Sequence, residues 1–390
     1  MIADLHAHYP MHLRRKLRRQ RASTVRALRA SESGFWERLK AFVLYVANRV
    51  ANFETPFSRP RVTIDRMKEG GVGIALSVLY QPFDEIDLSK DYGDPPSSAY
   101  FDDLLRQLED VEGEIEQKHS DDAVFVKTAA ELRAAIDGGK IAMVHCVEGG
   151  FHLGASAGEV RERVEALRDR GVFYVTVAHL FWRQVATNAP ALPFLTDEQY
   201  HDLFPQPGGV GLSPLGEALV EAMLDNGVVV DISHMSERSL ADLEALLERR
   251  TQLPPVPIIA THVACRMNGS QHYNLSDETI SMVRSRGGLI GLIFADHQMV
   301  DGPGAARTRD FEDTKRVLFA HIDYLHQKTG SHEYTAIGSD LDGFIKPTLA
   351  GLEDMRRMRR LEEALRVRYP EDADEILGGN AIRVLERALP

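Results

Sequence analysis

Eight apolar runs, each bounded by Gly, Pro or charged residues, are the feature that most constrains the fold of this chain. They are rich in Val and Ile and have the length of buried strands. The runs cover residues 2–8, 72–80, 141–150, 173–180, 227–234, 257–262, 287–295 and 334–343. Strands that are apolar on both faces are typical of parallel sheets covered by helices, so the runs predict an α/β protein.

Amphipathic helical patterns lie between the runs, for example over residues 158–171, 213–227, 236–250 and 276–287. The last three patterns begin with Ser and several end on Gly, as helix caps should. Eight alternating units of strand and helix most simply close into a (β/α)8 TIM-type barrel. An open, doubly wound sheet is the alternative.

We expect a single barrel domain over residues 1–390, interrupted by a helical insertion at about 10–60 that is longer than an ordinary loop between strand and helix. Residues 14–30 of the insertion are strongly basic, and residues 35–53 are amphipathic with aromatic side chains. This pattern favours a solvated insertion packed on the body or on a second subunit; a helix that binds a membrane surface or an anionic partner is the alternative.

Polar side chains that can bind metals stand at the ends of six of the predicted strands. They are His6, His8, Glu148, His179, His234, His262 and Asp340. Taken singly, each is more simply a hydrogen-bonded loop residue. In a barrel, however, all of these strand ends meet at one mouth, where active sites of this architecture lie.

Imidazole and carboxylate ligands without thiolate suit zinc, and also manganese, iron or cobalt. Six ligands are too many for one tetrahedral ion but suit a pair of ions that share a carboxylate, for which Glu148 is the central candidate. Because paired metals lower the pKa of a shared water, the pattern predicts hydrolytic chemistry.

Composition excludes some other classes of protein. A net charge of −12 argues against a nucleic-acid binder. The insertion is too short and too charged to span a membrane. With two cysteines, Cys146 and Cys265, and no leader pattern before the first strand, a cytoplasmic location is expected.

Several segments carry a family resemblance. They include "VEGG" (147–150), "GLSPLGEALVEAMLDNGVVVDISHMS" (211–236), "THVACRMNGSQHYNLSDE" (261–278) and "GSDLDG" (338–343). In these segments the chain resembles the membrane (renal) dipeptidase family, a branch of the metal-dependent amidohydrolase superfamily, and the resemblance extends over nearly its whole length.

The resemblance implies two zinc ions per chain, a (β/α)8 barrel and a homodimer. His6, His8 and Asp340 would hold one metal, His234 and His262 the other, and Glu148 would bridge them. A metal-bridging hydroxide would attack the carbonyl of a small amide or peptide bond. His179 would steady the oxyanion, and Asp340 would pass a proton to the leaving amine. A dipeptide is the first substrate to expect.

Two residues depart from the family pattern. His8 stands where the family has Asp, which removes one negative charge and predicts a weaker or different first metal, with a single bound ion as an alternative. Tyr273 stands where the family has an Arg that holds the substrate carboxylate, and a phenol cannot form that charged pair. Arg266 or His272 in the same loop could compensate.

The loss of that Arg keeps other functions open. One is hydrolysis of a different small amide, a cyclic amide or an ester. Another is a metal-binding or ligand-binding barrel without turnover.

Overall fold

The computed structural model describes residues 1–12, 60–81, 85, 92–94, 99–250, 256–267, 271–300, 305–343 and 345–390. Apart from its first and last residues, the predicted insertion at about 10–60 lies outside these ranges. None of the described helices combines the length and apolarity needed to cross a membrane.

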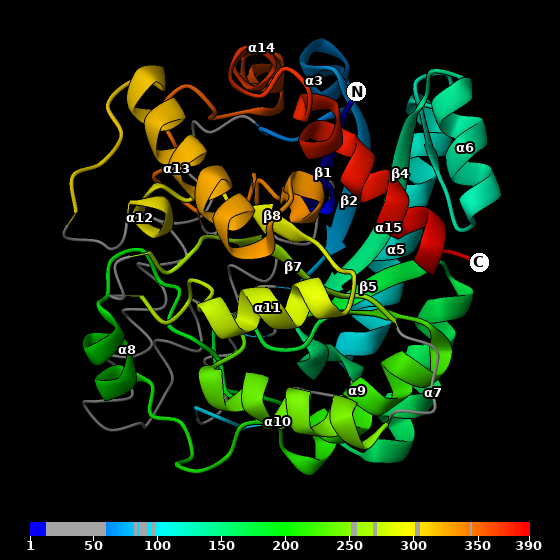
Figure 1. Ribbon diagram of the computed structural model, residues 1–390. Helices are drawn as coiled ribbons and strands as arrows, with labels where there is room; N and C mark the ends of the chain where they lie inside the picture. The colour runs from blue at the N-terminus through cyan, green and yellow to red at the C-terminus, as the bar shows by residue number, and fades with distance from the viewer. Residues whose placement is uncertain are drawn as a thin grey trace, which may run out of the picture.

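A closed parallel barrel forms the centre of the described chain (Figure 1). Its strands, with one addition, are β1 (Ile2–Ala7), β2 (Val72–Leu79), β3 (Ala123–Phe125), β4 (Ile141–Glu148), β5 (Val172–Thr176), β6 (Val229–Asp231), β7 (Ile258–Val263), β8 (Ile290–Leu292) and β9 (Thr335–Ile337). The order is β2-β1-β9-β8-β7-β6-β5-β4, and pairing of β2 with β4 closes the ring. The predicted (β/α)8 barrel is confirmed, and the open sheet is wrong.

β3 is the addition. It pairs with the first three residues of β4, before the point where β5 begins to pair with that strand, so it lies outside the ring of eight. The sequence analysis did not predict β3, because three residues with only one fully buried side chain give no readable apolar pattern.

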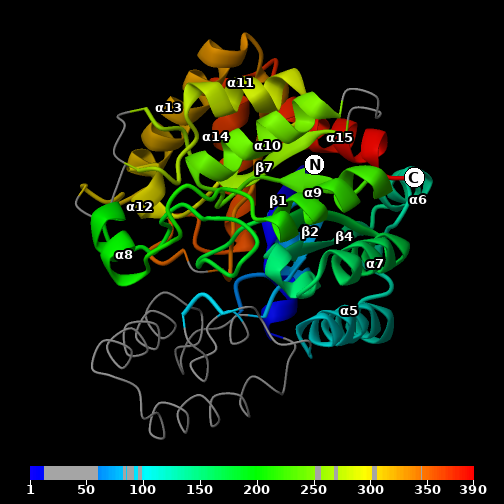
Figure 2. The ribbon, with the colours of Figure 1, turned by 90° about the horizontal axis from the view of Figure 1, so that it is seen from below.

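Helices surround the barrel (Figures 1 and 2). They are α3 (Ile64–Gly70), α5 (Ala99–Lys118), α6 (Ala129–Asp137), α7 (Ala157–Asp169), α8 (Asp197–Leu203), α9 (Pro214–Asn226), α10 (Glu237–Arg249), α11 (Asp277–Ser285), α12 (Asp296–Met299), α13 (Phe311–Thr329), α14 (Met358–Arg368) and α15 (Asn380–Ala388). The predicted serine caps are present: the hydroxyls of Ser213, Ser236 and Ser276 accept backbone N–H groups at the starts of α9, α10 and α11.

Several strands end earlier than the apolar runs predict. His179 lies three residues after β5, His234 three after β6 and Asp340 three after β9. His234 and Asp340 have left-handed backbone conformations, with φ of 67° and 53°, which cannot continue a strand. Such strained non-glycine residues cluster at functional sites, and here they turn two polar side chains over the barrel mouth.

Candidate metal centre

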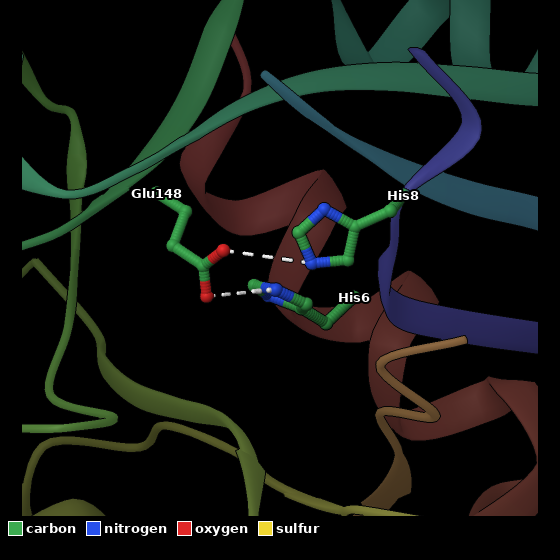
Figure 3. A group of neighbouring side chains, drawn as sticks. All are labelled: His6, His8 and Glu148. Atoms are coloured by element: carbon green, nitrogen blue, oxygen red, sulfur yellow. Dashed lines mark ion pairs between the residues drawn. The ribbon is translucent and has the colours of Figure 1, made fainter. Parts of the chain in front are cut away.

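Glu148, the last residue of β4, is the centre of a buried polar cluster. Its Oε1 lies 3.2 Å from His6 Nε2, 3.3 Å from His179 Nε2, 3.4 Å from His262 Nε2 and 3.7 Å from His234 Nε2. Figure 3 shows how His6, in β1, and His8, just after it, point toward this carboxylate. Side chains from four strands or the loops that follow them therefore converge on one carboxyl group.

Three further contacts complete the cluster. His8 Nε2 lies 2.9 Å from Asp340 Oδ1 and 3.5 Å from Glu148 Oε2. The Nε2 atoms of His234 and His262 are 2.9 Å apart. The backbone fixes the first contact, because Asp340 N–H donates to His6 O and His8 N–H donates to Leu341 O.

The donor atoms of this cluster fit divalent metal ions. His6, His8 and Glu148 offer donor atoms within 4.8 Å of one another, and so do Glu148, His234 and His262. His6 Nε2, Glu148 Oε2 and Asp340 Oδ1, which face the cluster, are buried without a hydrogen-bond partner among the described residues. Leaving buried polar atoms unpaired is costly, and a bound cation would satisfy the carboxylate and relieve the crowding of nitrogen lone pairs.

Hydrogen bonds behind two histidines direct their free nitrogens at Glu148. Tyr174 donates its hydroxyl proton to Leu5 O, so its oxygen accepts from His6 Nδ1–H at 2.8 Å. Thr261 donates its hydroxyl proton to an Asp231 oxygen, so it accepts from His262 Nδ1–H at 2.7 Å. Both imidazoles thus keep the Nε2 lone pair that a metal needs.

Two buried carboxylates below the cluster tie the strands together. Asp4 in β1 accepts the backbone N–H and the hydroxyl of Ser339, which follows β9. Asp231 in β6 accepts from Thr176 on β5 and from Thr261 on β7. Asp231 also lies within ligand distance of His6 and His262, but these hydrogen bonds already occupy its oxygens. We therefore assign both carboxylates to the framework.

The protonation states of three of these residues suit metal binding. Burial, reinforced by neighbouring histidines, holds the pKa values of His234 and His262 well below the usual range, so both imidazoles are neutral. Burial alone would raise the pKa of Glu148, but His179 and His6 outweigh it and lower that pKa to about 2. The neutral imidazoles of His234 and His262 and the ionised carboxylate of Glu148 are the ligand forms that metal binding requires.

His179 has a carboxylate partner that the sequence analysis missed. Its Nδ1 lies 2.6 Å from Glu85 Oε2, and Glu85 is fully buried. Glu85 in turn accepts from the Tyr80 hydroxyl and from Phe181 N–H. Burial opposes protonation of His179, but Glu148 and Glu85 outweigh it and raise its pKa to about 9. No pattern identifies Glu85 in the sequence, because its partner lies 94 positions away.

The three substrate-binding residues predicted in the 261–278 segment do not all reach the cavity. Tyr273 lines the cavity, yet its hydroxyl donates to His262 O at 2.6 Å and its ring packs edge-on against His234. Arg266 donates to carbonyls of its own loop and pairs with Glu237, and His272 is about half exposed beside the same glutamate. The structure does not bring Arg266 or His272 to the cavity lining.

A small cavity opens on the cluster. His8, Glu148, His179, His234, Tyr273 and Asp340 line one part of it. The rest of the lining is Leu180, Ala191, Ile293, His297, Gln298 and Ile345. Polar groups that converge on one concave site, beside a few apolar side chains, are what a small-molecule site requires.

Comparisons with known proteins show which proteins this chain is similar to. The model of the family described as membrane dipeptidase (peptidase family M19) matches residues 1–389. Dipeptidase tcpJ of Claviceps purpurea (strain 20.1) is 26% identical over 327 residues, which are 83% of this chain and 68% of that protein. Dipeptidase verJ of Clonostachys rogersoniana is 24% identical over 325 residues, 83% of this chain and 74% of that one.

Solved structures show the same fold. The metallopeptidase dipeptidase AC of family M19 superposes with a TM-score of 0.69 at 19% identity, covering 100% of this chain and 98% of that one. A metallopeptidase from Rhodobacter sphaeroides also gives 0.69 at 19% identity, with 99% of each chain covered. The chain therefore belongs to the membrane dipeptidase family, peptidase family M19, and is a metal-dependent hydrolase.

Proposed function

We propose that this chain hydrolyses the peptide bond of dipeptides, or a similar small amide bond, with two divalent metal ions held by the cluster around Glu148. The observation that carries the proposal is the convergence of imidazoles on one buried carboxylate at the mouth of the barrel. Zinc is the ion proposed, because all of the donors are imidazole or carboxylate.

The ligands divide into two groups. We assign His6, His8 and Asp340 to one ion and His234 and His262 to the other, with Glu148 shared. Bound in this way, the ions would lower the pKa of water and polarise the substrate carbonyl.

In the proposed reaction, one residue of the chain transfers a proton and another stabilises the negative charge of the oxyanion. Asp340 lines the cavity, so its carboxylate can accept a proton from the attacking water and deliver it to the leaving amine. His179 Nε2 faces the cluster while Nδ1 is bound to Glu85, so His179 can donate a hydrogen bond to the developing oxyanion.

The substrate class rests on relatives and on the cavity. The Rhodobacter sphaeroides structure contains a phosphinate mimic of the dipeptide L-Ala-D-Ala, which makes dipeptides the first compounds to test here. A non-dipeptide amide, cyclic amide or ester is the second candidate, because the Tyr273 hydroxyl is occupied by His262 O and Arg266 is bound within its own loop.

A substrate panel tests the proposal. Purified protein is assayed with L-Ala-D-Ala and other dipeptides, with N-acyl amino acids and with lactones, before and after removal of metal by a chelator. We expect chelator-sensitive hydrolysis of at least one amide, restored by zinc. Hydrolysis that continues in metal-free protein would contradict the proposal, as would a metal-loaded protein inert toward the whole panel.

Glu85→Gln is expected to lower kcat by about 10- to 100-fold with little change in KM or metal content. The amide cannot hold His179 as an ionised carboxylate does, and outer partners of this kind are commonly worth such factors. The measurement is steady-state kinetics with metal analysis. Glu85→Gln should add little to His179→Ala in the double variant. Additive losses, or loss of metal from Glu85→Gln, would show that Glu85 does not act through His179.

A further inference from the structure

The hydroxyl of Thr261, a fully buried residue of β7, contacts two of the proposed metal ligands at once. Its Oγ1 lies 2.7 Å from His262 Nδ1 and 3.1 Å from His6 Nδ1. The two imidazole rings lie against each other, with their centroids 3.7 Å apart. Because His6 is assigned to one ion and His262 to the other, a single hydroxyl group serves a ligand of each.

The direction of these hydrogen bonds follows from Asp231. The Thr261 hydroxyl donates its single proton to Asp231 Oδ2 at 2.7 Å, and both lone pairs of Oγ1 are then free to accept from the Nδ1–H groups of His6 and His262. His6 shares its Nδ1 proton between Thr261 and the Tyr174 hydroxyl, which is 2.8 Å away. In the described part of the chain, Thr261 is the only hydrogen-bond partner of His262 Nδ1.

Asp231 fixes the position of the Thr261 hydroxyl. Its Oδ1 accepts the backbone N–H of Thr261 at 3.0 Å, and its Oδ2 accepts the hydroxyl of Thr176 on β5 at 2.6 Å in addition to that of Thr261. Asp231 is fully buried, like Thr261. The Thr261 hydroxyl cannot rotate away from the imidazoles without leaving buried polar atoms unpaired, which is costly.

We infer that Thr261 is a positioning residue shared by the two metal sites, and that its hydroxyl orients His6 for one ion and His262 for the other. The inference deepens the proposed function and rests on its assignment of two ions. Outer partners that fix the tautomer and orientation of a ligating histidine strengthen metal binding. Since one hydroxyl serves both histidines, its loss should weaken the binding of both ions.

Stepwise zinc dissociation constants test the inference. Metal-free protein is titrated with zinc in competition with a chromophoric chelator, which gives one constant for each ion. Thr261→Val removes the hydroxyl and is expected to raise the constant of the ion held by His262 by about 10- to 100-fold. The other constant should rise by a smaller factor, because His6 keeps its bond to Tyr174. Tyr174→Phe identifies the ion held by His6, and should raise that constant alone.

Thr176→Val is the matched control. Thr176 donates to the same oxygen of Asp231 as Thr261 does, but in the part of the chain that the structure describes its hydroxyl bonds to no imidazole. This variant should leave both constants unchanged. Thr261→Ser keeps the hydroxyl and should bind both ions as the wild type does. Thr261→Ala gives the same comparison as Thr261→Val if the valine variant does not fold.

An unchanged constant for either ion in Thr261→Val would overturn the inference. An equal loss in Thr261→Ser would overturn it too, because the effect would then come from packing. So would an equal loss in Thr176→Val, because the effect would then come from Asp231. The titrations measure binding and not hydrolysis, so a protein that shows the expected constants but cleaves no amide would contradict the proposed function and leave this inference intact.

Discussion

Glu148→Gln is expected to weaken metal binding at this site strongly and to lower kcat/KM by roughly 10²–10³-fold or more. Four imidazole nitrogens lie within 3.7 Å of Glu148 Oε1, and that oxygen belongs to the carboxylate proposed to bridge both ions. Removing one partner from a buried charged cluster costs about 3–5 kcal/mol, which corresponds to this loss of rate. Metal content by mass spectrometry and steady-state kinetics measure the two effects.

Glu112→Gln is the control for this substitution. Glu112 also accepts from a buried histidine, since its Oε1 lies 3.3 Å from His145 Nε2, but neither residue lines the cavity. We expect the Glu112 variant to keep its metal and its activity. If Glu148→Gln were to retain the metal content and rate of the wild type, Glu148 would not be the centre of the site.

Asp340→Asn is expected to lower kcat by about 10²–10⁴-fold, the range that general acid–base groups contribute. The amide oxygen can still act as a ligand beside His8, whereas the amide cannot take a proton from water. The variant should therefore lose far more activity than metal. Rates are compared at equal metal content, so that weaker binding is not mistaken for a loss of proton transfer.

Asp342→Asn serves as the neighbouring control. The Asp342 carboxylate accepts the backbone N–H groups of Arg61 and Val62 and so shapes the loop rather than facing the cavity. An asparagine oxygen can accept the same groups. If the two asparagine variants lost activity equally, the effect would belong to the loop, and the proton role of Asp340 would be rejected.

The barrel could be predicted because strands buried on both faces leave long Val- and Ile-rich runs in the sequence. The candidate ligands could be predicted because a barrel brings all carboxyl ends to one mouth. The ends of the strands were predicted less accurately. The turns at His234 and Asp340 depend on left-handed backbone conformations, which apolar patterns do not reveal.

Residues that act through a partner were harder to find. Glu85, Asp4 and Asp231 matter because of hydrogen bonds to residues distant in the sequence, and no spacing rule encodes those pairs. Arg266 and His272 are close to Tyr273 in the sequence, but closeness in sequence does not determine where a side chain points. Both side chains pair with Glu237 instead of facing the cavity. The cytoplasmic location, the homodimer and the helical insertion stay predictions.

Activity measured as a function of bound metal tests the central claim most directly. Metal-free protein is titrated with zinc, and metal per chain and hydrolysis of the best substrate are recorded at each point. We predict no activity without metal and a rise that saturates at two ions per chain in the wild type. Glu148→Gln should bind the metal far more weakly and should show the loss of activity predicted above. Full hydrolysis at less than about one ion per chain would contradict the account.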